Sequence, residues 1–214
     1  MKEKVQQHLE LLISRYPELA AVEADIAACF EMIRASYEAG GKLILGGNGG
    51  SCSDAEHIVG ELMKGFTLRR KLGNSMIQAL EAVDPVAGSE LGGCLQGGLP
   101  AIALSSHPSL NTAYLNDVNG DMMFAQQLNV LANPTDVFFA ISTSGNAKNL
   151  YYAAVVAKAK GMKVALLTGK TGGKLKALAE VSMIMPSNET YQIQELHLPV
   201  YHCLCLMLEE HFFG

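Results

Sequence analysis

The stretch Leu45-Gly-Gly-Asn-Gly-Gly-Ser-Cys-Ser-Asp-Ala-Glu-His-Ile-Val-Gly-Glu61 follows a short apolar run and passes into a helical pattern. Glycines lack a Cβ, so backbone N–H groups in such a turn can come close to a ligand, and the start of a helix favours an anion. Ser53 and Glu56 match a capping box, which predicts a helix that starts near Ser53. The stretch therefore predicts a strand, a phosphate-binding turn and a helix.

His57 and Glu61 lie in the helical part of this stretch, at positions i and i+4. Side chains with this spacing leave the same face of a helix. Such a pair can serve acid–base chemistry or hold a metal ion. Each residue taken alone is more often an ordinary core or surface side chain, so the pair needs support from elsewhere in the chain.

Short apolar runs alternate with helical patterns along the rest of the chain, and several runs lead into a turn rich in Gly, Ser or Thr. Right-handed crossovers convert such βα repetition into a doubly wound parallel sheet, with its loops gathered at the carboxyl ends of the strands. We therefore expect an α/β fold with a five-stranded, flavodoxin-like sheet. Its predicted strands are Leu43–Leu45, Ala101–Leu104, Val137–Ile141, Val164–Leu167 and Val181–Met185.

The two ends of the chain carry helical patterns. Residues 1–40 hold two apolar stripes, divided at Pro17, and precede a domain that we expect over residues 41–214. A long apolar helical pattern begins at Thr190 and contains Pro199. Because proline cannot donate its backbone hydrogen bond, this pattern predicts a kink or a local break.

Residues 69–98 do not follow the βα repetition. They contain a short helical pattern, Ser75–Val83, and then the glycine-rich stretch Gly88–Gly98. A connection of this length inside a compact α/β domain is usually functional. We therefore expect an inserted, flap-like segment or an interface element.

Composition narrows the class of protein. Hydrophobic residues make up 49% and charged residues 17%, a balance typical of a buried parallel sheet. A formal net charge of −5 with 16 Lys and Arg residues gives little support to nucleic-acid binding. The sequence shows no membrane-length apolar run and no secretory pattern at its start, which predicts a cytoplasmic location with no membrane partner. The five cysteines form no Cys-x-x-Cys pair, so we expect reduced thiols.

A second donor-rich turn is predicted after the strand that ends at Ile141. Ser142, Thr143 and Ser144 stand there, directly before a helix predicted to begin near Ala147. By itself the turn is equally well explained as a local helix cap. Together with the glycine-rich turn at the same sheet edge, it favours a phosphate site.

The last helical pattern contains Gln194, His197 and His202. Their spacing permits a partly shared face but is not a zinc signature. On spacing alone, a structural role is the better explanation for this trio.

The ordered motifs resemble those of the sugar isomerase (SIS) domain family, and within it the phosphoheptose isomerases. These enzymes interconvert sedoheptulose 7-phosphate and D-glycero-D-manno-heptose 7-phosphate. The resemblance covers nearly the whole chain, with residues 69–98 as the main departure. It is carried by Gly47-Asn-Gly-Gly-Ser51, His57-x3-Glu61, Asn116-Asp117, Ser142-Thr-Ser-Gly-Asn146, Leu167-Thr-Gly-Lys170 and Ile193-Gln-Glu-Leu-His-x4-His202.

The resemblance implies a set of roles. It implies Glu61 and His202 as the catalytic acid–base pair, a homotetramer with sites shared between subunits, and N-terminal helices in its central bundle. The implied zinc ligands are His57, Glu61, Gln194 and His202. The implied substrate contacts are Asn48, Gly49, Gly50, Ser51, Glu61, Asn116, Asp117, Ser142, Thr143, Ser144 and Gln194.

Some positions depart from the family pattern. Ala147 stands where a third hydroxyl often follows the second loop, and Tyr191 and Gln192 replace a common acidic residue and arginine. These departures leave open an isomerase of a C5 or C6 sugar phosphate. A sugar-phosphate-sensing domain and a non-catalytic SIS protein of the replication-initiator-associating type also stay open. Proteins of that last type lack the glutamate and the terminal histidine that this chain has.

Overall fold

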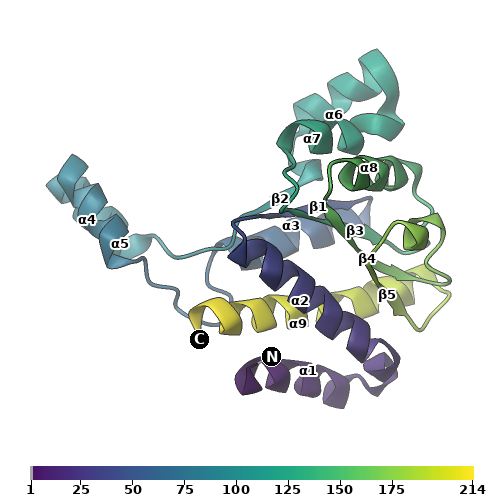
Figure 1. Cartoon of the computed structure of the whole chain (residues 1–214), viewed down its shortest axis with the longest axis horizontal. Helices are drawn as coiled ribbons and strands as arrows, with labels where there is room; N and C mark the ends of the chain where they lie inside the picture. The colour runs from purple at the N-terminus through teal and green to yellow at the C-terminus, as the bar shows by residue number, and fades with distance from the viewer. Residues whose placement is uncertain (1) are drawn as a thin grey trace.

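The computed structural model describes residues 2–214, and its centre is a five-stranded parallel sheet in the order β2-β1-β3-β4-β5 (Figure 1). This is the order of a flavodoxin-like doubly wound sheet, so the predicted fold class is confirmed. Each predicted apolar run became a strand, with ends shifted by at most a few residues. The strands are β1 (Leu43–Gly47), β2 (Ala101–Ala103), β3 (Val137–Ser142), β4 (Lys163–Gly169) and β5 (Val181–Met185).

The central strand β3 is buried on both faces. Val137, Phe139 and Ile141 join one hydrophobic cluster, whereas Phe138 and Ala140 join another on the opposite face. This alternation follows from the two-residue period of a strand. A continuous apolar run is therefore the signal of a strand with helices on both sides.

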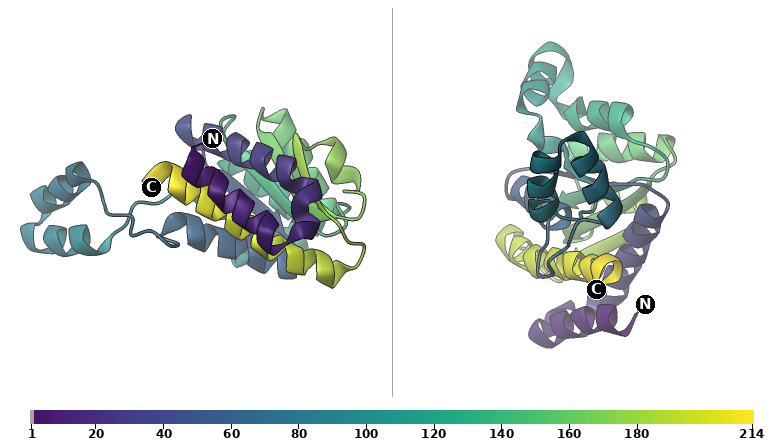
Figure 2. Two further views of the ribbon diagram at one scale, coloured as in Figure 1. Left: turned by 90° about the horizontal axis from the view of Figure 1, so that it is seen from below. Right: turned by 90° about the vertical axis from the view of Figure 1, so that its left-hand side faces the viewer.

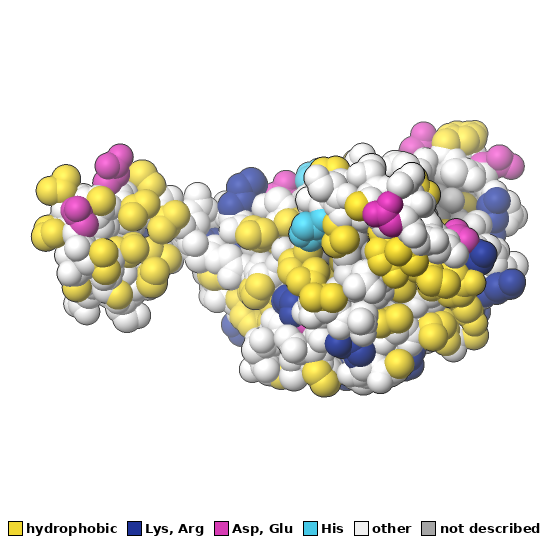
Figure 3. All heavy atoms as spheres, turned by 90° about the horizontal axis from the view of Figure 1, so that it is seen from above, with side chains coloured by type: hydrophobic (Ala, Val, Ile, Leu, Met, Phe, Trp, Pro, Cys, Tyr) yellow, Lys and Arg dark blue, Asp and Glu magenta, His cyan; other side chains and the backbone are white. Residues whose placement is uncertain are grey.

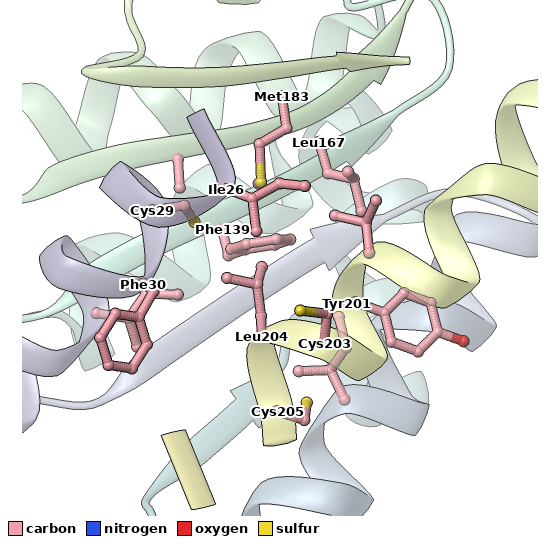
Figure 4. Close-up of a cluster of buried hydrophobic side chains, with 14 of the residues drawn as sticks. Ile26, Cys29, Phe30, Phe139, Leu167, Met183, Tyr201, Cys203, Leu204 and Cys205 are labelled. Carbon is pink, nitrogen blue, oxygen red and sulfur yellow. The ribbon is translucent and has the colours of Figure 1, made fainter. Parts of the chain in front are cut away.

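Helices cover both faces of the sheet (Figures 1 and 2). One cluster draws its residues from α2 (Glu23–Glu38), α3 (Gly50–Met63) and α9 (Thr190–Phe213), and Figure 4 shows Ile26 and Leu204 packed around Phe139. The other face is covered by α7 (Met123–Leu131) and α8 (Lys148–Ala159). The remaining short helices are η2 (Leu104–Ser106), α6 (Pro108–Tyr114), η3 (Leu115–Asn119), η4 (Gly120–Met122) and η5 (Lys174–Ala177).

The N-terminal residues form α1 (Glu3–Arg15), which lies alongside α9 (Figure 2). Pro17 opens a short 3₁₀ helix, η1 (Pro17–Val22), and thereby separates α1 from α2 as predicted. The buried residues of α1 are Val5, Leu9 and Leu12, which form its apolar stripe.

Helices α4 (Asn74–Val83) and α5 (Pro85–Cys94) form a hairpin that projects away from the sheet; we call residues 74–94 the arm (Figures 1 and 2). The expected helix from Ser75 is present, but the stretch from Gly88 continues as a helix, which the glycines did not suggest. Asp84 explains this difference because its carboxylate accepts hydrogen bonds from the backbone of Val86 and Ala87, both at 2.9 Å.

The arm is exposed along most of its length. Of its residues, all of which the structure describes, Gly88 alone is buried, where it lies against the backbone of Glu81. Val83 is 88% exposed and Val86 is 81% exposed. Figure 3 shows hydrophobic side chains spread over the arm's surface.

An ion pair anchors the root of the arm. The buried Arg70 guanidinium donates to Glu209 on α9 at 2.8 Å and to the carbonyls of Leu62 and Glu61 at the end of α3, at 2.6 and 2.9 Å. Burial opposes ionisation of Glu209, but hydrogen bonds from the Thr67 and Phe66 backbone, together with Arg70, lower its pKa to about 2. Arg70 therefore joins the root of the arm to α3 and α9, and each of its guanidinium nitrogens has a hydrogen-bond acceptor.

One local prediction was wrong, and a second was wrong in part. Helix α3 begins at Gly50 after a Gly49 cap rather than near Ser53, and Glu56 accepts a hydrogen bond from Ser105 at 2.8 Å instead of closing a capping box. Of the kink or local break predicted at Pro199, the break is absent, because α9 runs as one helix of 24 residues; the kink stays a prediction. A proline removes only one backbone hydrogen bond, and the buried face of α9 on the sheet holds the helix on both sides of it.

Among residues 2–214, no helix is long and apolar enough to cross a membrane.

Candidate active site

The glycine-rich loop joins β1 to α3, and neighbouring atoms leave no room for a side chain at some of its positions. A Cβ on Gly47 would collide with the backbone carbonyl of Ser51, and Gly49 has a φ of +55°. Ser51 is buried in the first turn of α3. The loop therefore brings backbone N–H groups to the helix N-terminus without side chains in the way.

The second loop, after β3, lies at the same sheet edge. β1 and β3 pair in parallel, with Gly47 beside Ile141. Ser142 is held by Thr168 Oγ1, which donates to its carbonyl at 2.6 Å, and its own hydroxyl accepts from the Gly145 backbone at 3.2 Å. Thr143 and Ser144 are only partly buried, so their side chains reach the surface of the loop.

A pair of amides joins the glycine-rich loop to the first turn of α8, which follows the second loop. Asn48 Nδ2 donates to Asn149 Oδ1 at 3.0 Å, and Asn149 Nδ2 donates back to Asn48 Oδ1 at 2.8 Å. Asn149 lies in the first turn of α8 and was not selected from the sequence. The two donor-rich turns that the sequence predicts separately are thus brought together.

His57 and Glu61 face each other on α3. His57 Nε2 lies 3.2 Å from Glu61 Oε1, and Lys64 Nζ lies 3.2 Å from Glu61 Oε2. The Glu61 side chain is only 12% exposed, whereas that of His57 is 42% exposed. The carboxylate is therefore largely withdrawn from water while it keeps two charged or chargeable partners.

Helix α9 supplies the opposite wall of the site. The His202 ring lies edge-on to His57, with ring centroids 5.0 Å apart, and also packs against Phe66. Its buried Nε2 has no hydrogen-bond partner among residues 2–214. Burial lowers the pKa of His202, as does the nearby His57, while the charge of Glu61 opposes both effects.

Gln194, two turns before His202 on α9, lies over the glycine-rich loop. Its Nε2 is 2.6 Å from the point where a Cβ on Gly50 would stand. The structure thus brings His202 beside His57 and Glu61 on α3, and it places Gln194 at Gly50, the first residue of the same helix.

Tyr201 and Asp54 also belong to this site, although neither of them was singled out from the sequence. The Tyr201 hydroxyl lies 3.0 Å from His57 Nδ1 and 3.3 Å from Asp54 Oδ1. Burial raises the pKa of both Tyr201 and Asp54 above their ordinary values. Asp54 precedes His57 by three residues on the same helix, a spacing that could have drawn attention to it.

His197 lies in the core, as expected for the structural role that its spacing favours. It is fully buried, and its Nε2 lies 3.4 Å from the carbonyl oxygen of Thr168. Burial lowers its pKa to about 4, so the ring is neutral at neutral pH.

Asn116 and Asp117 lie in η3, where Asn116 Nδ2 donates to Asp117 Oδ1 at 2.8 Å. Both side chains are exposed. Their hydrogen bond is to each other rather than to either loop, so their expected contact with substrate stays a prediction.

Within residues 2–214, no group of three or more His, Cys, Asp or Glu side chains is already arranged around a metal position. Several features nevertheless suit zinc. A tetrahedral zinc ion with bonds of about 2.0–2.1 Å separates neighbouring ligand atoms by about 3.3 Å, which is close to the 3.2 Å between His57 and Glu61. The unpartnered His202 Nε2 is a further available donor. The donor set therefore fits zinc chemically.

The doubly wound sheet, with its two donor-rich loops at one edge, fits a SIS-domain protein, and comparison with known proteins agrees. The SIS domain family model matches residues 73–169. The phosphoheptose isomerase of Trichlorobacter lovleyi is 36% identical over 99% of this chain and 93% of its own length, and that of Helicobacter pylori strain P12 is 40% identical over 80% and 76%. The chain belongs to the phosphoheptose isomerase family.

Solved structures agree with this assignment. The phosphoheptose isomerase of Francisella tularensis superposes with a TM-score of 0.76 at 28% identity, covering 98% of this chain and all of that one. The Neisseria gonorrhoeae enzyme gives a TM-score of 0.73 at 28% identity, covering 97% and 98%. The chain is therefore an enzyme, an isomerase of sugar phosphates.

Proposed function

We propose that this enzyme interconverts sedoheptulose 7-phosphate and D-glycero-D-manno-heptose 7-phosphate, with Glu61 and His202 as its acid–base pair. The observation that carries the proposal is that His202 on α9 packs edge-on against His57, which neighbours Glu61 on α3, and that the glycine-rich loop precedes the same helix α3. The names of the curated relatives supply the heptose substrate.

The two loops would bind the phosphate. Backbone N–H groups of Gly49 and Gly50, the Ser51 hydroxyl and the hydroxyls of Ser142 to Ser144 are the donors. The starts of α3 and α8 favour negative charge. Asn116 and Asp117 are proposed to contact substrate hydroxyls. Ala147 brings no hydroxyl to this set, so the phosphate depends more on the backbone.

The reaction moves a proton between adjacent carbons through an enediolate. Starting from the ketose, Glu61 removes a proton from C1, a C1–C2 double bond forms, and the C2 carbonyl oxygen receives a proton from His202. His202 then takes the proton of the C1 hydroxyl while Glu61 returns its proton to C2, which yields the aldose. The lowered pKa of His202 makes its protonated form a stronger acid toward the C2 oxygen.

His57, Glu61, Gln194 and His202 are the residues proposed to hold zinc. A bound zinc ion would polarise the substrate carbonyl and orient its hydroxyls. Glu61 keeps a second carboxylate oxygen for proton transfer, because His57 faces only Oε1. The Lys64 ammonium, which lies 3.2 Å from Oε2, would have to move away so that the substrate can reach this oxygen.

We further propose a homotetramer in which the N-terminal helices contribute to a central bundle. A groove of about 200 Å³ runs between α1 and α9, and its lining includes Leu11, Leu198 and Leu206 as well as His202. Leu11 is 55% exposed, so α1 offers apolar surface to a neighbouring copy. Light scattering on the purified protein measures the assembly directly.

The decisive experiment assays the purified enzyme on C5, C6 and C7 ketose phosphates, with and without a chelator. We expect turnover to be highest with the C7 substrate and to fall about 10²–10⁴-fold in Glu61→Gln. Glu56→Gln is the matched control, because Glu56 lies on the same helix but is bonded to Ser105. Unchanged turnover in Glu61→Gln would remove Glu61 as the base.

The remaining outcomes of the assay are equally informative. Faster turnover of a C5 or C6 substrate would replace the heptose assignment. Binding of sugar phosphate without turnover of any substrate would contradict the catalytic assignment of Glu61 and His202.

A further inference from the structure

Tyr201 joins two elements of the site through a single hydroxyl. Its side chain is 2% exposed on α9, and Figure 4 shows the hydroxyl directed away from the packed core. The hydroxyl oxygen lies 3.0 Å from His57 Nδ1 and 3.3 Å from Asp54 Oδ1. Both partners are on α3, one helical turn apart.

The hydroxyl has only one proton to donate, and the chemistry of its partners decides where that proton goes. An ionised Asp54 can only accept, so the Tyr201 proton points to Asp54 Oδ1. The remaining lone pair of the hydroxyl must then accept from His57 Nδ1. A neutral His57 in this arrangement carries its proton on Nδ1 and none on Nε2.

The free Nε2 lone pair faces another acceptor. Glu61 Oε1 lies 3.2 Å away, a distance at which two bare acceptors repel unless a proton or a cation lies between them. We propose that Tyr201, oriented by Asp54, is a positioning residue that fixes the Nδ1–H tautomer of His57, so that Nε2 and Glu61 together receive a cation. The inference rests on the proposed function, because it gives His57 and Glu61 a shared task there.

The hydroxyl can be separated from the packing of the ring. The Tyr201 ring packs edge-on against His57 and His202, with centroids 5.5 and 5.0 Å apart. Phenylalanine keeps these ring contacts and loses only the hydrogen bonds. Tyr201→Phe therefore tests the orientation of His57 rather than the stability of α9.

Nitrogen-15 NMR of the histidine rings reads the tautomer directly, on chelator-treated protein without substrate, at about pH 8 where unpaired histidine is neutral and carboxylates are ionised. We expect Nδ1–H for His57 in the unmodified protein. Tyr201→Phe should give a mixture with Nε2–H. Asp54→Ala should give mainly Nε2–H, because the Tyr201 proton is then free to turn to Nδ1.

Tyr37→Phe is the matched control, since the Tyr37 hydroxyl also bonds within the protein, to the Pro100 carbonyl at 3.2 Å, but away from His57. It should leave the His57 signals unchanged. An Nε2–H tautomer in the unmodified protein, or an unaltered His57 spectrum in both Tyr201→Phe and Asp54→Ala, would overturn the proposal.

Titration with Zn²⁺ alone gives a second readout. Loss of the orienting hydroxyl should weaken zinc binding by about 10–100-fold in Tyr201→Phe, and Tyr37→Phe should bind as the unmodified protein does. Equal affinity in the two variants would contradict the positioning role. The isomerase assay on the unmodified protein tests the proposed substrate and the proposed base. The NMR and zinc measurements test the His57 tautomer, so the two proposals can fail independently.

Discussion

This chain has two glycine-rich regions with opposite surroundings. The loop from Gly46 to Gly50 lies between a buried strand and a half-buried helix, and a Cβ on Gly46, Gly47 or Gly50 would collide with neighbouring atoms. The arm, in contrast, carries Gly92 and Gly93 in an exposed helix, and a Cβ on Gly93 would meet nothing within 4 Å. The comparison teaches that a glycine has a steric purpose where a neighbouring segment crowds it, as at Gly47 in the loop and at Gly88 in the arm, and has none at Gly93.

The largest effect is expected at the root of the arm, where Arg70 joins it to α9 and to the end of α3. Arg70→Met leaves Glu209 buried without its cation, so the free energy of unfolding should fall by about 3–5 kcal/mol. Urea denaturation measures the change. The exposed neighbour gives the control, Arg69→Met, which should change stability little; equal losses in both variants would show that Arg70 is not the anchor.

A fall in pH should also reduce the stability that the Arg70–Glu209 ion pair gives to the root of the arm. The folded pKa of Glu209 is about 2, below its usual 4.5, so its contribution is present above pH 4.5 and is lost as pH falls toward 2. The contribution is about 3 kcal/mol. Stability curves of Glu209→Gln should therefore be flatter over this range than those of the unmodified protein, whereas Glu210→Gln should retain the slope.

The next-largest effect is expected in the glycine-rich loop, where the backbone crowds Gly47. Gly47→Ala forces a Cβ against the Ser51 carbonyl, and we expect a loss of about 1–3 kcal/mol with a raised KM for the sugar phosphate. Thermal unfolding and steady-state kinetics measure the two consequences. If Gly47→Ala left both the stability and the KM unchanged, the loop would have room for a Cβ and the steric explanation would be wrong.

The smallest effect is expected in the arm and has the opposite sign. Gly93→Ala adds a methyl group in open space and restricts the unfolded chain, so α5 should gain about 0.5–1 kcal/mol. Hydrogen exchange of the α5 amides detects this local change. Faster exchange would indicate that Gly93 contacts something that a single copy of the chain does not contain.

Most of the fold was predictable because strands buried on both faces leave an unmistakable signal. All five predicted runs became strands, and the loops followed at their carboxyl ends. Helix ends were harder, since Gly49 caps α3 through a left-handed conformation rather than through the Ser53 and Glu56 side chains. The glycine-rich arm was misjudged because its Asp84 cap, with Pro85 behind it, outweighed the weak helix propensity of glycine.

The site was predictable in its parts but not in its connections. Local spacing indicated His57 with Glu61, and the resemblance added Gln194 and His202. No local pattern marked Tyr201, whose apolar neighbours on α9 made it look like an ordinary core residue. Likewise, the bond between Asn48 and Asn149 spans 101 residues and exists only because β1 and β3 are adjacent.

The sequence by itself determined the parallel sheet, the two donor-rich turns and the pairing of His57 with Glu61, because these depend on short-range periodicity and backbone freedom. Only the tertiary structure decided that Tyr201 reaches His57 and Asp54, that Arg70 anchors the arm to Glu209, and that α4 and α5 remain exposed. Such features depend on which faces meet after folding. Hydrogen-bond partners 139 to 147 residues apart are set by the packing of α9 on α3 and on the root of the arm.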